Sequence, residues 1–134
     1  MLEVGLMEKN RMYYHNLEIW KRCMSLTVKV QNMTINELPK FEMYETGSQI
    51  RRSVKSVQAN IVEGFGRRRY KLDFLHFLII AQASLDETIN HLEVLFQTGS
   101  LKNERIFTEL SKEIDEIGKM LTKFIQSVEN NHKS

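Results

Sequence analysis

Apolar residues recur every three to four positions in four long segments of the chain, the spacing typical of amphipathic α-helices. The segments run from about residue 17 to 35, from residue 41 or 46 to 63, from 72 to 96 and from 103 to 128. The single proline, Pro39, ends the first segment, because the residue before a proline is disfavoured in helical geometry. Four long helices with short connections predict an all-α, up-down-up-down four-helix bundle.

The first helix carries two apolar stripes on nearly opposite sides. The first stripe consists of Leu17, Trp20, Met24, Val28 and Ile35. The second consists of Ile19, Cys23, Leu26, Val30 and Met33. A helix that is apolar on two sides has to be covered on two sides. Since the bundle of one chain covers a single side, we expect the second stripe to face a neighbouring subunit of a homo-oligomer.

The bulk composition is that of one ordinary globular domain. The chain has 134 residues, of which 42% are hydrophobic and 27% charged, and this size and balance fit a single core. We expect the bundle to occupy residues 13–129, with flexible tails at 1–12 and 130–134. The sequence lacks a secretion signal and an apolar run of about 18 residues that could cross a bilayer. Because one cysteine excludes an internal disulfide, we expect a cytoplasmic protein.

Positive charge is concentrated in one stretch of this weakly charged chain. Between residues 51 and 71 there are seven basic residues and one acid, a net charge of +6, whereas the whole chain carries +2. Such a concentration predicts an anionic partner, nucleic acid before membrane. The basic residues are Arg51, Arg52, Lys55, Arg67, Arg68, Arg69 and Lys71.

The second helix also has a row of small and polar residues beside its apolar stripe. The row consists of Gln49, Ser53, Ser56, Asn60 and Glu63, and it is followed by Gly64 and Gly66. We expect the small side chains to allow a close helix approach. Asn60 is expected to be a buried hydrogen-bonding residue that ties the helix end or fixes a subunit contact. Gly64 is predicted to stop the helix in the left-handed conformation that glycine adopts easily. Glu63 is expected to pair with one of the arginines that follow.

Candidate chemistry is sparse. No histidine or cysteine lies near the serines in sequence to activate them. A di-iron bundle needs two Glu-x-x-His repeats and two further glutamates, whereas Asp73 with His76 and Glu87 with His91 have the spacing of surface pairs. The glycines at 64 and 66 lack the lysine of a nucleotide loop. We therefore expect no enzymatic activity, metal, cofactor or small-molecule substrate.

The stretch from 48 to 68, SQIRRSVKSVQANIVEGFGRR, resembles the hallmark of the 23S ribosomal RNA intervening-sequence proteins. Two further stretches resemble the same family, LEIW from 17 to 20 and FLHFLIIAQASLDE from 74 to 87. The resemblance implies a bacterial four-helix bundle that assembles into a ring-like homopentamer with a basic surface. It implies no established biochemical activity.

Two functional hypotheses follow. In the first, the seven basic residues bind RNA or other nucleic acid, with Phe65 or Tyr70 stacked on an unpaired base. In the second, the protein is an interaction scaffold or accessory subunit that docks an acidic protein. The arginines could also be solvated, or pair with acids of a neighbouring subunit. Arg51, Arg52 and Lys55 support the first hypothesis only if they share a surface with residues 67–71.

Overall fold

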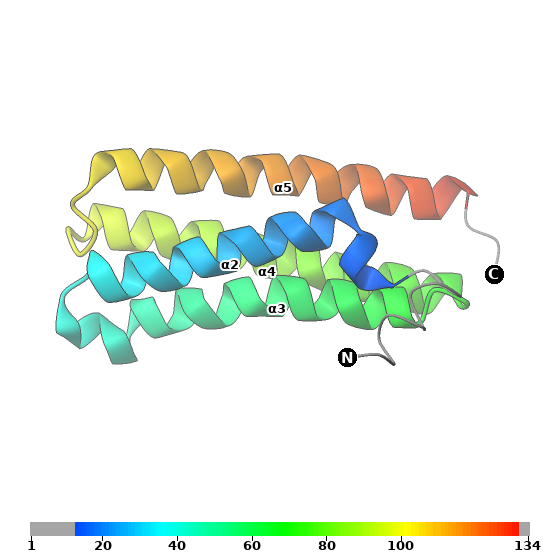
Figure 1. Cartoon of the computed structure of the whole chain (residues 1–134), viewed down its shortest axis with the longest axis horizontal. Helices are drawn as coiled ribbons and strands as arrows, with labels where there is room; N and C mark the ends of the chain where they lie inside the picture. The colour runs from blue at the N-terminus through cyan, green and yellow to red at the C-terminus, as the bar shows by residue number, and fades with distance from the viewer. Residues whose placement is uncertain (1–12, 132–134) are drawn as a thin grey trace.

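The computed structural model describes residues 13–131, and all regular structure in this range is helical. The elements are η1 (Tyr14–Asn16), α2 (Glu18–Asn36), η2 (Lys40–Tyr44), α3 (Thr46–Gly66), α4 (Lys71–Gln97) and α5 (Glu104–Asn131). Consecutive long helices run in opposite directions side by side (Figure 1). The prediction of an all-α four-helix bundle is therefore confirmed. No helix within the described range is long and apolar enough to span a membrane.

The four long helices form a square in cross-section. α2 packs against α3 and α5, α4 packs against the same two helices, and the α3–α4 contact is the most extensive. α2 and α4 are thus diagonal neighbours. The α2–α3 and α4–α5 connections lie at one end of the bundle, and the α3–α4 turn and the last turn of α5 lie at the other (Figure 1).

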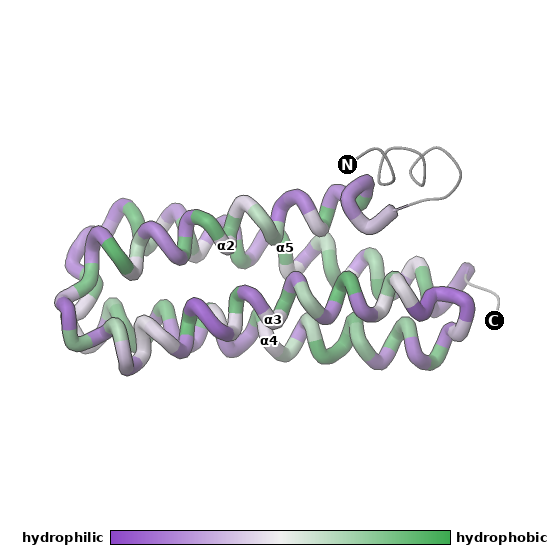
Figure 2. Tube along the Cα trace, turned by 60° about the horizontal axis from the view of Figure 1, so that its bottom comes forward, coloured by the Kyte–Doolittle hydropathy of each residue, from purple (hydrophilic) through white to green (hydrophobic). Residues whose placement is uncertain are grey.

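Each helix contributes one apolar stripe to a continuous core, and hydrophobic and hydrophilic positions alternate along all four helices (Figure 2). α5 has a single apolar stripe, which buries Leu110, Ile114, Ile117, Leu121, Ile125 and Val128. α5 also continues to Asn131, so the tail predicted from residue 130 includes two helical residues. The predicted tail at 1–12, and residues 132–134 of the other tail, lie outside the described residues.

The two apolar stripes of α2 exchange the places predicted for them. Ile19, Cys23, Leu26, Val30 and Met33 are all buried in the core of one chain. The prediction that these five residues form a subunit interface is therefore wrong, because helices of the same chain already cover them. The exposed residues belong to the other stripe, in which Met24, Val28 and Ile35 face outward.

The connection before α3 is held by a buried carboxylate that the sequence pattern did not reveal. Glu42 Oε1 accepts a hydrogen bond from the Gly47 backbone N–H at 3.2 Å, and Ser100 Oγ lies 2.6 Å from Glu42 Oε2. Glu42 thereby caps the start of α3 and ties it to the α4–α5 connection. A Cβ at position 47 would overlap the Glu42 carbonyl oxygen, so this close approach requires glycine.

Candidate nucleic-acid interface

The serines in the row of small and polar residues on α3 form a tight seam against α4. The hydroxyls of Ser53 and Thr88 lie 2.9 Å apart, and those of Ser56 and Ser84 lie 2.8 Å apart. Ser53, Ser84 and Thr88 are buried. Paired hydroxyls let two helices approach closely without leaving a buried polar group unsatisfied. These serines serve helix packing, as their small size predicted.

Asn60 lies at the edge of this seam and is half-buried. Its side-chain amide donates to the Ser56 carbonyl oxygen at 2.8 Å and to Ser56 Oγ at 3.1 Å. The same serine hydroxyl contacts Ser84 of α4. Asn60 therefore makes hydrogen bonds as predicted, but it is half-buried rather than buried, and it acts within its own helix by holding the Ser56 hydroxyl toward α4.

The structure explains the glycine at position 64 by close packing and not by the helix stop that was predicted. α3 continues through it to Gly66, and the only glycine with a positive φ in the described residues is Gly99, at 83°. A Cβ on Gly64 would lie 3.0 Å from Phe77 Cβ and 3.2 Å from the Phe74 carbonyl oxygen. Gly64 thus permits the close contact with α4 and does not end the helix. A Cβ on Gly66 would meet nothing within 4 Å.

Residues 67–70 form the connection between α3 and α4, and we call this connection the arginine turn. Within it, Arg67 lies 3.8 Å from carboxylates of both Glu63 and Asp73, and its guanidinium is 5.0 Å from the centre of the Phe77 ring. The predicted pairing of Glu63 with an arginine is confirmed by this contact. Both carboxylates and Arg67 are about half exposed, so the two ion pairs are surface interactions.

Arg68 is engaged with its own helix, and this changes the role of Phe65. Arg68 Nη1 donates to the Phe65 carbonyl oxygen at 2.9 Å, and the guanidinium lies 4.1 Å from the centre of the Phe65 ring. Phe65 is buried and packs edge-on against Phe74. The prediction that Phe65 stacks on a base is therefore wrong, because the core and Arg68 cover its ring.

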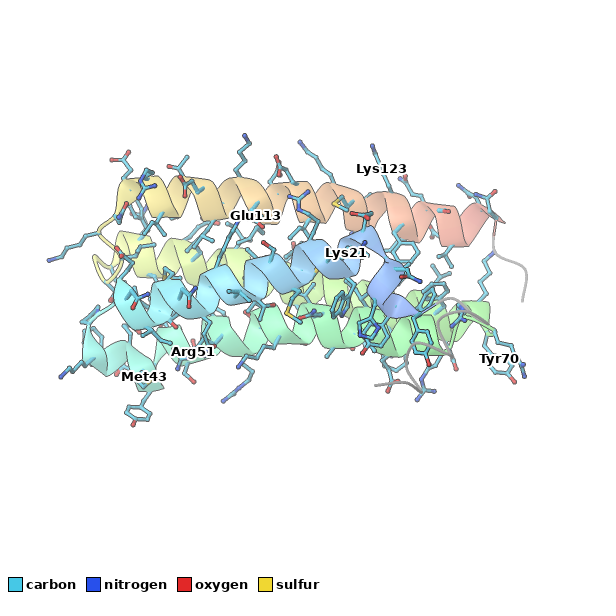
Figure 3. The ribbon with its side chains drawn as sticks, in the orientation of Figure 1. Lys21, Met43, Arg51, Tyr70, Glu113 and Lys123 are labelled. Carbon is cyan, nitrogen blue, oxygen red and sulfur yellow. The ribbon has the colours of Figure 1, made fainter. Side chains whose placement is uncertain are left out.

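Arg69 and Tyr70 are the open part of the turn. Arg69 is exposed and makes no hydrogen bond or ion pair with residues 13–131. Tyr70 is 61% exposed, and its side chain points away from the end of the bundle (Figure 3). Lys71, in contrast, donates to the Glu129 carbonyl oxygen at 2.7 Å and so ties the start of α4 to the last turn of α5. An unpaired guanidinium beside an exposed phenol can contact a phosphate and an unstacked base.

The three basic residues of the α3 helix lie apart from this turn. Lys55 lies eleven residues before Gly66, the last residue of α3, which corresponds to about 17 Å along the helix. Arg51 lies next to Met43 at the opposite end of the bundle from Tyr70 (Figure 3), and its Nη2 donates to the Met43 carbonyl oxygen at 2.7 Å. The structure therefore does not gather the seven basic residues into one patch. Arg52 and Lys55 are exposed and have no hydrogen bond or ion pair within the described range.

Two other groups considered from the sequence also have structural explanations. Burial raises the pKa of the Cys23 thiol from 9.0 to about 12, although the neighbouring Arg22 opposes this effect. The thiol is therefore protonated and unreactive at neutral pH. His91 and Glu87 lie 3.9 Å apart on one face of α4, as their four-residue spacing predicted.

The arrangement of its four long helices places the chain in the class of small four-helix-bundle proteins. Within this class, the chain belongs to the 23S rRNA-intervening sequence protein family, whose model matches residues 15–123. It is also similar to the crystal structure of a protein of unknown function from the S23 ribosomal protein family of Bacteroides thetaiotaomicron VPI-5482. The identity is 25%, the TM-score is 0.69, and the match covers 81% of this chain and 95% of that one. The curated proteins contain no match to the sequence.

Proposed function

We propose that the protein binds RNA, without catalysing a reaction, through the arginine turn. The observation that carries this proposal is that two neighbouring residues, Arg69 and Tyr70, are both exposed, and that Arg69 has no hydrogen bond or ion pair within residues 13–131. A guanidinium binds phosphate, and an exposed aromatic ring stacks on an unpaired base, which are the two elements of single-strand recognition. The chain belongs to a family that is named after ribosomal RNA, and this favours RNA over other polyanions.

The ion pairs of Arg67 leave it available for the same ligand. Half-exposed pairs such as those with Glu63 and Asp73 contribute roughly 0–1 kcal/mol each. A phosphate that replaces one of these carboxylates forms a charge-assisted contact of at least similar strength. Arg67 and Arg69 together would then provide two adjacent phosphate contacts, while Arg68 holds the turn on Phe65.

The test compares two charge-neutralising double variants in an RNA gel-shift assay at low salt. R67Q/R69Q removes two cations from the arginine turn, whereas the control K112Q/K123Q removes two exposed cations from α5. We expect R67Q/R69Q to weaken RNA retention at least tenfold and the control to leave it nearly unchanged. Equal retention by both variants would remove the arginine turn from the account.

A second proposal, self-association, is favoured by the exposed stripe of α2. Met24, Val28 and Ile35 form an apolar row along one helix face, beside the half-buried Trp20. Apolar rows of this kind favour protein contact. We propose that the chain forms a homo-oligomer through this face, and a pentamer is the form that the family resemblance implies. Several arginine turns in one assembly would increase the avidity for RNA.

An acidic protein partner is the alternative occupant of the basic surface. A pull-down before and after nuclease treatment separates the two kinds of ligand, because only a protein partner survives the nuclease. Light scattering at micromolar concentration tests self-association separately. We expect a mass several times 15.8 kDa, and a mass of one chain would contradict the proposal.

A further inference from the structure

We infer that an RNA strand bound at the arginine turn places one unpaired guanine base in the groove between the start of α2 and the second half of α3. This base contact is additional to the RNA binding proposed above, on which it rests. Three features of the groove support it: its position beside the arginine turn, its aromatic wall, and the polar groups of its lining.

The groove has a volume of about 460 Å³ and one of its ends lies beside the arginine turn. Glu63 lines this end, and its Oε2 is 3.8 Å from Arg67 Nε. From Glu63 the lining follows α3 back to Lys55, which is about 12 Å along the helix. The opposite side consists of η1 and the start of α2, which lie at the same end of the bundle as the arginine turn (Figure 1). A strand held at the turn can therefore continue directly into the groove.

One wall of the groove is aromatic. Tyr14 of η1 and Trp20 of α2 line it, and their ring centroids are 5.5 Å apart. His15 packs against both rings, at 4.0 Å from Tyr14 and 5.0 Å from Trp20. Trp20 is half-buried, and the apolar side chains of Met24 and Val62 complete the lining around it. Aromatic surfaces of this kind hold bases that have left their own stack.

The polar lining offers a hydrogen-bond donor and a strong acceptor. Gln58 lines the groove, and its Nε2 is buried without a hydrogen-bond partner in the described part of the chain. Buried donors are rarely unpaired, and the carbonyl oxygen of a base would satisfy this one. Glu63 supplies carboxylate oxygens, which only accept hydrogen bonds. Guanine has one carbonyl oxygen and two adjacent N–H donors on its Watson–Crick edge, so it is the base that gives a carboxylate two contacts.

The two opposite charges of the groove also fit a nucleotide. Lys55 is exposed and has no hydrogen bond or ion pair within residues 13–131, so its ammonium can bind the phosphate next to the base. Glu63 repels phosphate, so the group that lies beside it is a base and not the RNA backbone. A phosphate that binds Arg67 in place of a carboxylate, as proposed above, also frees Glu63 for this contact.

Fluorescence of Trp20, the only tryptophan of the chain, reports on the groove directly. The probes are two single-stranded RNAs of about ten nucleotides, long enough to cover the turn and the groove. One is oligouridine, and the other is the same strand with one central guanosine. We expect the guanosine strand to quench Trp20 of the native chain and to bind about tenfold more tightly in a gel shift, a discrimination typical of a two-contact base readout.

Glu63→Gln tests the base contact itself, because it places an N–H donor opposite a donor of guanine. Glu63 is exposed, so far-UV circular dichroism should show unchanged helix content. We expect this variant to bind the two strands with equal affinity. R67Q/R69Q should instead weaken both strands by the same factor and keep the preference for guanosine. The control Gln126→Ala, at an exposed position of α5, should keep both the affinity and the preference.

Three results would overturn the groove assignment while the arginine turn stands. They are equal affinity of the native chain for the two strands, unchanged Trp20 fluorescence at saturating guanosine strand, and a preference that persists in Glu63→Gln. A native chain that binds neither strand would overturn the proposed function and the base contact together.

Discussion

Helices α2 and α3 each have a covered side and an exposed side that look alike in the sequence. On α2, Val30 is fully buried and Val28 is 50% exposed, although both belong to apolar stripes. On α3, Gly64 is pressed against α4, whereas Gly66 faces open space two residues later. The difference shows that polarity alone does not determine which side of a helix is covered. The neighbouring helices decide it, and the remaining side is free to contact a partner.

We expect the largest effect on stability from replacing Val30 or Val28 of α2 by aspartate, one at a time. Val30→Asp places an unpaired carboxylate in the core, and we expect it to cost at least about 4 kcal/mol, a large part of the stability of a small domain. Val28→Asp should retain full helix content, because its carboxylate lies outside the core of the chain. Far-UV circular dichroism and urea unfolding measure both. Two variants with equal unfolding midpoints would contradict the placement of the stripes.

An alanine at each of the two glycines tests the same difference on α3. In Gly64→Ala the added methyl group meets Phe77 Cβ and the Phe74 carbonyl oxygen, and such overpacking typically costs about 1–3 kcal/mol. In Gly66→Ala no neighbour is met, and the higher helix propensity of alanine should leave stability unchanged or raise it by up to about 1 kcal/mol. Urea denaturation gives both values. A Gly64→Ala variant as stable as Gly66→Ala would mean that the seam is looser than the contacts indicate.

Cys23 reports on the covered side of α2 through the pH dependence of stability. Its pKa is raised from 9.0 to about 12 by burial, so the unfolded chain loses this proton first as the pH rises. Below pH 9 the thiol is protonated in both states and costs nothing. Between pH 9 and about 12 the free energy of unfolding should fall by an extra ~1.4 kcal/mol per pH unit. Urea unfolding of the native chain and of Cys23→Ala at pH 8, 9 and 10 isolates this slope, and parallel curves would contradict it.

The sequence predicted the helices and much of the α3–α4 seam, because both depend on local periodicity and small residues. It correctly placed the serines in helix packing and Glu63 beside an arginine, and it predicted that Asn60 makes hydrogen bonds. It assigned the wrong stripe of α2 to the surface, since two stripes of similar polarity differ only in which helices pack on them. The buried Glu42 was also missed, because its partners Gly47 and Ser100 meet only in the folded chain.

The seven basic residues show the same limit of local information. They are close in sequence, but a helix separates positions by about 1.5 Å per residue, so Arg51 and Tyr70 lie at opposite ends of the bundle (Figure 3). Self-contacts then occupy Arg51, Arg68 and Lys71. Charge counts along the chain could not predict these contacts, which depend on where the helix ends and on what lies beside it.

The salt dependence of RNA affinity tests the central functional claim most directly. Each phosphate contact with single-stranded RNA contributes about 0.7 to the slope of log affinity against log salt concentration. We expect R67Q/R69Q to reduce the magnitude of this slope by about 1.4 relative to the native chain, and K112Q/K123Q to leave it unchanged. A slope that is the same for all three proteins, or that falls equally in both variants, would contradict RNA binding at the arginine turn.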